Sequence, residues 1–315
     1  MSKRKIICLV YPFTKNEEAL YNGRRGSLEI IGTELYHLLK QNVHDFDVDL
    51  WSELSENIDF DNDVLLLLCT IDTCPYHVVN KFRNVAYWFD DVNIWKLEGQ
   101  GYVDKFPLIK YIFHPVFENY SMLKKKFPHA NVNYVPWSIA KLPDLFNKTE
   151  VVSYYLDVDE RPPVKNSIQY AMQFIKFIAH ENCVVYLNNR YSTMDFVDLT
   201  CKIVFVPDMG HDEFLNLIST CWFYVSGIAG SYEYSVVESA LLGCGLINLN
   251  SALPSEHTRD FCYLNLIEFS SVEMLILKDL ISLFNYKINI ESARVKYPNT
   301  ASSIINSTLL LERID

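Results

Sequence analysis

The chain has 315 residues, 50% of them hydrophobic, 14% aromatic and 21% charged, so it can form a large core and is not disordered as a whole. Its formal net charge of −11 argues against an indiscriminate nucleic-acid binder, and no apolar run reaches the roughly 18 residues of a membrane span. The basic N-terminus has no long apolar segment or cleavage site of the kind found in signal peptides. We therefore expect a soluble cytoplasmic protein whose eight cysteines are mostly buried free thiols.

The first half of the chain alternates apolar strands with segments of helical periodicity. We expect strands at residues 5–13, 46–51, 63–70, 84–90, 110–116 and 132–137, and helices at residues 27–41 and 118–127. The segment at 63–70, DVLLLLCT, is almost entirely apolar, which is typical of a parallel strand buried on both faces. The alternation predicts a Rossmann-like, doubly wound N-terminal domain over residues 1–140.

The second half repeats this alternation after a polar, proline-bearing stretch at residues 141–150, which we interpret as a linker. We expect strands at residues 152–158, 183–188, 201–208, 222–228 and 245–250, and helices at residues 166–181, 211–221 and 233–243. The predicted fold class is therefore α/β, with two Rossmann-like domains facing across a cleft at the carboxyl ends of their strands. The second domain is expected at residues 141–285, followed by a helical segment at 286–315 whose packing the pattern does not assign.

Several common signatures of nucleotide chemistry are missing. There is no Walker motif, no G-x-S-x-G elbow, and no G-x-G-x-x-G after the first strand. Instead, Gly23 and Gly26 lie in a long loop before the first helix, where the backbone could approach a ligand at the helix N-terminus. An ordinary turn is an equally good interpretation of these two glycines.

Basic residues are unevenly distributed. Residues 1–150 contain 17 Lys and Arg against 20 Asp and Glu, whereas the remainder contains 11 against 19. The first half also holds three basic clusters: residues 3–5, Arg24 with Arg25, and Lys124, Lys125 and Lys126. Each alone is typical of solvated surface, but together they leave room for a polyanionic partner on that half.

The segment EYSVVESALLGCG, residues 233–245, has the most specific pattern. Placed after the strand at 222–228, Glu233 falls in the loop or first turn of a helix and Glu238 about one and a half turns later. Carboxylates there can accept hydrogen bonds from vicinal hydroxyls of a sugar or a ribose, and Ser235 adds a donor suited to a diphosphate. The alternative is two solvated glutamates on an amphipathic helix, although apolar residues bracket Glu238.

A second candidate lies at the start of the same half. Arg161 and Lys165 precede the helix at 166–181, where two cations can neutralise a departing diphosphate. Alone, such a pair is more often found as solvated loop charges.

Together these residues resemble the donor-binding domain of retaining GT-B glycosyltransferases. The two glutamates of the common members are eight residues apart, but here Gly230 occupies the earlier position. The five-residue spacing, with Tyr234 and Ser235 after the first Glu and Gly-Cys-Gly after the second, is more similar to the DNA α-glucosyltransferases of T-even bacteriophages. Those enzymes glycosylate 5-hydroxymethylcytosine in duplex DNA.

Two further segments resemble the same enzymes. Residues 164–182 are similar to the helix after their phosphate-binding pair, although the gap from Arg161 to Lys165 is one residue shorter. Residues 85–95 are similar to the segment in which a His-Asp pair reaches the sugar and the acceptor. Asp90 takes the Asp position, and Phe89 replaces the His.

The resemblance implies a role for each candidate residue. Glu238 would bind the ribose hydroxyls, Glu233 the transferred sugar, and Arg161 with Lys165 the diphosphate. Asp90 would position or deprotonate the acceptor hydroxyl, although a carboxylate that caps a turn explains it equally well. The implied donor is a UDP-sugar, carrying glucose or a pentose such as arabinose, with no permanently bound cofactor and no metal.

The implied acceptor is a hydroxymethylated base in double-stranded phage DNA, with the enzyme in the host cytoplasm and no membrane partner. A base turned out of the duplex needs aromatic side chains to stack on. The first half offers six candidates, which could equally well be core residues: Tyr11, Phe13, Tyr21, Tyr87, Trp88 and Trp95. A glycan or protein acceptor, or a catalytically silent binding module of the same fold, remains as an alternative.

Overall fold

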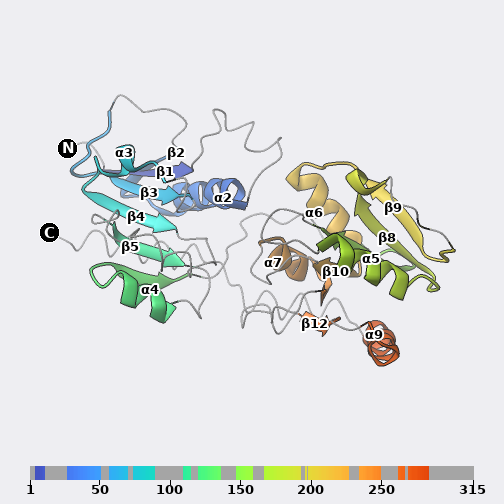
Figure 1. Ribbon diagram of the computed structural model, residues 1–315. Coiled ribbons are helices and arrows are strands. Elements are labelled where there is room, and N and C mark those ends of the chain that lie inside the picture. The colour runs from blue at the N-terminus through green and yellow to red at the C-terminus, as the bar shows by residue number, and fades with distance from the viewer. Residues whose placement is uncertain are drawn as a thin grey trace. The chain divides into compact units, whose positions relative to one another are not determined.

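The computed structural model describes residues 4–10, 27–50, 57–69, 74–88, 109–114, 120–135, 147–158, 167–192, 196, 198–226, 234–249, 262–266 and 269–283. The chain divides into two compact units. The first is Met1–Lys141 with Tyr297–Asp315, and the second is Leu142–Lys296. Each unit contains one six-stranded parallel sheet with helices beside it (Figure 1).

The sheet of the first unit has the strand order β2-β1-β3-β4-β5-β6, and all its neighbouring strands are parallel. Its strands are β1 (Arg4–Val10), β2 (Phe46–Leu50), β3 (Val64–Leu68), β4 (Asn84–Trp88), β5 (Ile109–His114) and β6 (Asn131–Tyr134). Its described helices are α2 (Ser27–Asn42), α3 (Tyr76–Val79) and α4 (Tyr120–Lys126). All of β3 is buried, which agrees with a central strand covered on both faces.

Alternate residues of these strands face two different helix layers. Leu65 and Leu67 belong to a core cluster that includes Leu123 of α4 and Val79 of α3. The other layer is formed by α2, whose Gly32 lies so close to β1 that an added Cβ would come within 2.3 Å of Val10 Cγ2. The glycine at this position is therefore a packing requirement.

The sheet of the second unit has the order β12-β11-β10-β7-β8-β9, again with all neighbours parallel. Its strands are β7 (Val152–Asp157), β8 (Cys183–Asn188), β9 (Lys202–Val206), β10 (Phe223–Ser226), β11 (Gly245–Asn248) and β12 (Cys262–Asn265). Its described helices are α5 (Ser167–Phe177), the short 3-10 helix η5 (Asn189–Tyr191), α6 (His211–Thr220), α7 (Tyr234–Leu241) and α9 (Ser271–Leu283).

This second sheet is also covered on both faces. Tyr154 packs edge-on against Phe174 of α5, in a cluster that also contains Leu277 of α9. The next residue, Tyr155, points the other way and packs edge-on against Phe214 of α6. Such alternation gives the doubly wound layering that the apolar strands predicted.

Each strand and helix expected at residues that the structure describes is present, although several end earlier than expected, as α5 does at Phe177 and β9 at Val206. The structure adds four elements that we did not predict: α3, η5, β12 and α9. The helix expected near the C-terminus lies outside the described residues. Among the helices that are described, none has the length and apolarity that crossing a membrane requires.

Candidate functional site

Polar residues end four adjacent strands of the second sheet. Asn248, Ser226, Asp157 and Asn188 are the last residues of β11, β10, β7 and β8, in their order across the sheet. Because these strands are parallel, the four residues share the carboxyl edge. The chain runs from β7 outward through β8 to β9 and returns through β10 to the other side, so the strand order reverses between β7 and β10. Ligands of doubly wound sheets bind at such a reversal.

A buried carboxylate lies beside this edge. Glu238, at the start of the second turn of α7, is only 2% exposed. Its Oε1 lies 2.6 Å from Nε2 of His211, the first residue of α6. Glu238 is therefore not the solvated helix residue that the sequence left as an alternative.

Two opposing effects act on this carboxyl group. Burial raises the pKa of Glu238, and the hydrogen bond and charge of His211 lower it. A buried carboxylate with a cationic or hydrogen-bonding neighbour at the ligand edge is typical of a binding or catalytic site.

The first turn of α6 is held firmly, which positions His211. The Glu213 carboxylate accepts a hydrogen bond from the Gly210 N–H at 3.1 Å and so closes the helix N-terminus. One turn along the same face, Phe214 rests on Tyr155, whose ring stacks on that of Tyr224 at 5.9 Å.

Tyr224 connects the sheet to the start of α7. Its hydroxyl donates to the Asp157 carboxylate and lies 3.0 Å from Ser235 Oγ. Ser226, next to Asp157 in the strand register, has a buried Oγ without a hydrogen-bond partner in the described part of the chain. These side chains line up polar groups at the point where the strand order reverses.

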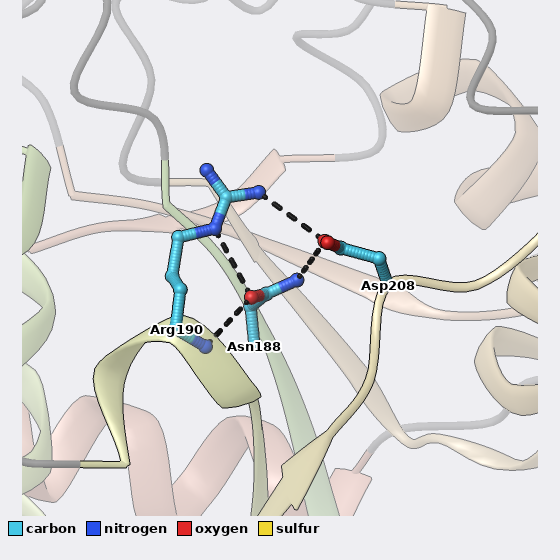
Figure 2. Close-up of polar contacts among 3 residues, drawn as sticks. All are labelled: Asn188, Arg190 and Asp208. Carbon is cyan, nitrogen blue, oxygen red and sulfur yellow. Dashed lines mark hydrogen bonds and ion pairs between the residues drawn. The ribbon is translucent and has the colours of Figure 1, made fainter.

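Another polar cluster joins the ends of β8 and β9 (Figure 2). Asn188 Oδ1 accepts hydrogen bonds from both the backbone N–H and Nε of Arg190, each at 3.0 Å. Asn188 Nδ2 donates to Asp208 at 3.0 Å, and the same carboxylate oxygen lies 3.6 Å from Arg190 Nη2. An amide and a carboxylate thus hold a half-exposed guanidinium at the carboxyl edge.

Eight of the predicted site residues lie outside the described part of the chain: Gly23, Arg24, Arg25, Gly26, Asp90, Arg161, Lys165 and Glu233. The neighbouring elements still agree with the expected context. Described β4 ends two residues before Asp90, and described α7 begins immediately after Glu233. The roles of these eight residues stay predictions.

The three lysines of the first unit occupy the last turn of α4. Lys124 and Lys125 are exposed, and Lys126 is half-buried. Since α4 runs from the carboxyl end of β5 back to the start of β6, its last turn lies at the amino-terminal edge of the sheet. Cations in the last turn of a helix also interact favourably with the helix dipole, which explains these lysines without DNA. A DNA contact by these lysines stays a prediction.

Two of the aromatic residues considered for base stacking are core residues. Tyr87 and Trp88 are each 1% exposed. They cannot offer a ring face to a base in this structure. Tyr11, Phe13, Tyr21 and Trp95 lie outside the described residues.

The Gly-Cys-Gly sequence after Glu238 has a structural explanation. Gly243 has a φ of 79° and ends α7, with its N–H donating to Ala240 O and the Cys244 N–H donating to Ser239 O. This is a Schellman cap, which favours glycine. The small residues therefore serve the end of α7 that lies away from the carboxyl edge.

The sequence pattern did not indicate a role for His211, Tyr224, Asp157 or the cluster around Arg190. One signal was available, because β7, β8, β10 and β11 are largely apolar and each ends in a polar residue. Which polar residues meet across strands was not readable from any single segment. Within the described ranges, no group of three His, Cys, Asp or Glu residues is placed to hold a metal ion.

No protein-family model matches the chain, and no curated protein matches it. Solved structures do. A sucrose-phosphate synthase from Thermosynechococcus elongatus has a TM-score of 0.64 at 10% identity, over 99% of this chain and 100% of that one. An α-glucosyltransferase in complex with UDP-glucose and DNA containing an abasic site has a TM-score of 0.55 at 13% identity, over 95% of both chains.

The T4 phage BGT in complex with its UDP-glucose substrate is also similar. Its TM-score is 0.51 at 13% identity, over 95% of this chain and 98% of that one. These likenesses show the fold, which is the α/β fold of GT-B glycosyltransferases with two parallel sheets.

Proposed function

We propose that this chain is a retaining glycosyltransferase. It moves a sugar from a UDP-sugar to the hydroxymethyl group of a modified base, of the 5-hydroxymethylcytosine type, in phage DNA in the host cytoplasm. The GT-B fold supports glycosyl transfer, and similar structures contain UDP-glucose, in one case together with DNA. The five-residue spacing of Glu233 and Glu238 supports the DNA-modifying branch.

The observation that carries this proposal is the buried Glu238 carboxylate. It lies on α7, whose first turn contacts the sheet where the strand order reverses, and this is where doubly wound sheets bind nucleotides. A carboxylate only accepts hydrogen bonds, and a ribose diol offers two donors. The Glu238 carboxylate can therefore accept hydrogen bonds from the hydroxyls of a nucleotide ribose.

The other roles follow the resemblance. Residues 141–285 form the donor domain, residues 1–140 the acceptor domain, and residues 286–315 a helical segment. In the donor domain, Arg161 and Lys165 bind the diphosphate, Ser235 adds a hydroxyl to it, and Glu233 faces the transferred sugar.

The acceptor domain supplies the remaining groups. Asp90 orients the acceptor hydroxyl, and the loop with Gly23 and Gly26 approaches the donor. Arg24 and Arg25, with Lys124, Lys125 and Lys126, contact DNA phosphates.

The reaction requires little further chemistry. The bond from the sugar C1 to the diphosphate oxygen breaks, and a bond from C1 to the hydroxymethyl oxygen forms on the same face. The proton of that hydroxyl passes to the departing diphosphate. Arg161 and Lys165 stabilise the negative charge that the diphosphate gains.

A mass measurement tests this function. The protein is incubated with hydroxymethylcytosine duplex DNA and a panel of UDP-sugars, and the digested nucleosides are weighed by mass spectrometry. We expect one hexose or pentose added to the hydroxymethylated nucleoside, and at least a hundredfold less with Glu238→Gln, because a neutral amide replaces the carboxylate acceptor. Glu150→Gln, at an exposed position, is the matched control.

The same experiment separates the alternatives. If no nucleoside gains mass but glycan or protein acceptors do, the protein is a glycosyltransferase and the proposed DNA acceptor is wrong. A chain that binds UDP-sugars and transfers to no acceptor is a silent GT-B module.

A further inference from the structure

We propose that His211 is a positioning residue that aims the Glu238 carboxylate at the ribose diol, so that the site selects ribonucleoside diphosphates over their 2′-deoxy counterparts. This inference rests on the proposed function, because it takes Glu238 as the ribose ligand. It adds a role for His211 and a preference for ribose over 2′-deoxyribose, neither of which the sequence pattern indicated.

Within the described part of the protein, the Glu238 side chain has one hydrogen-bond partner. Its Oε1 is satisfied by His211 Nε2 at 2.6 Å, and its side chain makes no other hydrogen bond to the described residues. Since the side chain is only 2% exposed, solvent contributes little. A carboxylate with one protein partner keeps acceptor capacity, and a ligand that supplies hydroxyl donors can use it.

The ring of His211 favours the ionised form of the Glu238 carboxyl group, which is the form that only accepts hydrogen bonds. Burial alone favours the protonated acid, which has a smaller acceptor capacity, and the histidine hydrogen bond opposes that effect. The hydrogen bond from the His211 ring also fixes the side-chain rotamer of Glu238. The ring is itself held in place, because Glu213 closes the first turn of α6 and Phe214 packs on Tyr155. One carboxylate oxygen is thereby left for the ligand.

Selectivity follows from this geometry. A ribose presents both its 2′ and 3′ hydroxyls, whereas a 2′-deoxyribose presents one fewer donor. The deoxy ligand therefore makes one hydrogen bond fewer to the buried carboxylate. Sites built to bind a hydroxyl reject analogues that lack it for this reason.

A purely structural role for His211 would have a different signature. If the ring only joined α6 to α7, its removal would weaken the binding of both nucleotides by the same factor. The ratio of the two dissociation constants is therefore the informative quantity. It is also independent of the fraction of folded protein, because both ligands are titrated into one preparation.

The experiment is calorimetric titration of the full chain with UDP and with 2′-deoxy-UDP. We expect the wild type to prefer UDP by about 10- to 100-fold. His211→Phe and His211→Ala should weaken UDP binding about tenfold or more and bring the ratio below about threefold. His211→Gln, whose amide nitrogen can donate from nearly the place of Nε2, should restore most of the preference. His180→Phe, at an exposed histidine of the same unit, is the matched control.

The outcomes separate this inference from the proposed function. If the wild type binds UDP but His211→Phe and His211→Ala keep the wild-type ratio, His211 does not position Glu238 for the ribose and the inference is wrong. Equal weakening of both ligands also overturns it. If the wild type binds neither nucleotide, the donor site itself is wrong, and the proposed function fails together with this inference.

Discussion

Two charged side chains of the second unit, the half-buried Lys148 and the buried Glu238, have very different numbers of hydrogen-bond partners. Lys148 Nζ donates to three backbone carbonyls, those of Ser219 at 3.1 Å, Cys221 at 2.6 Å and Leu242 at 3.1 Å. These carbonyls belong to the C-terminal ends of α6 and α7, where the helix dipoles favour a cation. Glu238, at the start of the second turn of α7, has only His211 as a side-chain hydrogen-bond partner among the described residues. The charge with three backbone acceptors indicates a structural role, and the charge with a single protein partner indicates a binding role.

Replacing Lys148 with Met should destabilise the protein. Three carbonyls would lose a charged donor, so we expect a loss of about 2–4 kcal/mol in the free energy of unfolding. Urea denaturation measures this loss, with exposed Lys176→Met as the control. An unchanged midpoint for Lys148→Met would contradict the capping role.

Glu238→Gln should instead stabilise the protein at neutral and alkaline pH. Burial raises the pKa of Glu238 above the value of about 4.5 that this carboxyl group has in the unfolded chain. The folded chain therefore holds the carboxyl proton more tightly than the unfolded chain does. The stability contributed by this group is complete below the unfolded pKa and is lost as pH rises through the folded pKa. Gln does not titrate, and its carbonyl can still accept from His211.

We therefore expect Glu238→Gln to melt about 2–4 °C above the wild type at pH 8, for a gain of about 1 kcal/mol. The gain should shrink below pH 5. Thermal melts at both pH values measure it, with Glu150→Gln as the control. A variant less stable than the wild type at pH 8 would show that the carboxylate is satisfied in the folded protein.

At the scale of elements, glycines mark where backbones come close or turn back. Gly243 lets α7 end in a left-handed conformation. Gly32 lets α2 approach β1 more closely than any side chain permits. Gly243 is needed for the local conformation of the chain, so it belongs to a motif that can be recognised in the sequence. Gly32 is needed for a contact between two elements, which no local motif indicates.

Gly32→Ala should destabilise the first unit by about 1–3 kcal/mol, because the new methyl group would overlap Val10 Cγ2. Val10→Ala removes that atom. The double variant should recover part of the loss, and a double-mutant cycle of thermal or urea unfolding measures the coupling. Additive effects of the two substitutions would show that the contact is not the cause.

At the scale of the whole molecule, charge is the main argument for and against a DNA partner. The net charge is −11, but the first 150 residues are closer to neutrality and hold the basic clusters. The lysines of α4 lie at the amino-terminal edge of their sheet. Any contribution they make to DNA binding is therefore a contact with phosphates away from the carboxyl edge.

Replacing Lys124, Lys125 and Lys126 with Gln should weaken binding to duplex DNA and flatten its salt dependence. The slope of log K against log salt becomes shallower by about 0.9 for every phosphate that the variant no longer neutralises. Fluorescence anisotropy at several salt concentrations measures the slope, and Lys176→Gln is the control. An unchanged slope would remove these lysines from the DNA surface.

Much of the fold could be predicted because the information is local. Apolar periodicity within single segments identified β1, α2, β7 and α6, and the repeated alternation of strand and helix predicted two parallel sheets. By contrast, α9 and β12 went unpredicted, although 271–283 has a largely apolar sequence. The burial of Glu238 was indicated by its apolar neighbours, whereas its partner was not.

The sequence by itself determined the order of elements, the doubly wound class and the two carboxylates with their unusual spacing, because these depend on residues close together in the chain. Only the tertiary structure decided that His211 and Glu238, 27 residues apart, meet at 2.6 Å. It also decided that the polar ends of four strands share one edge. The physical reason is that strand order and helix packing, which are set by the burial of the whole apolar surface, bring these residues together.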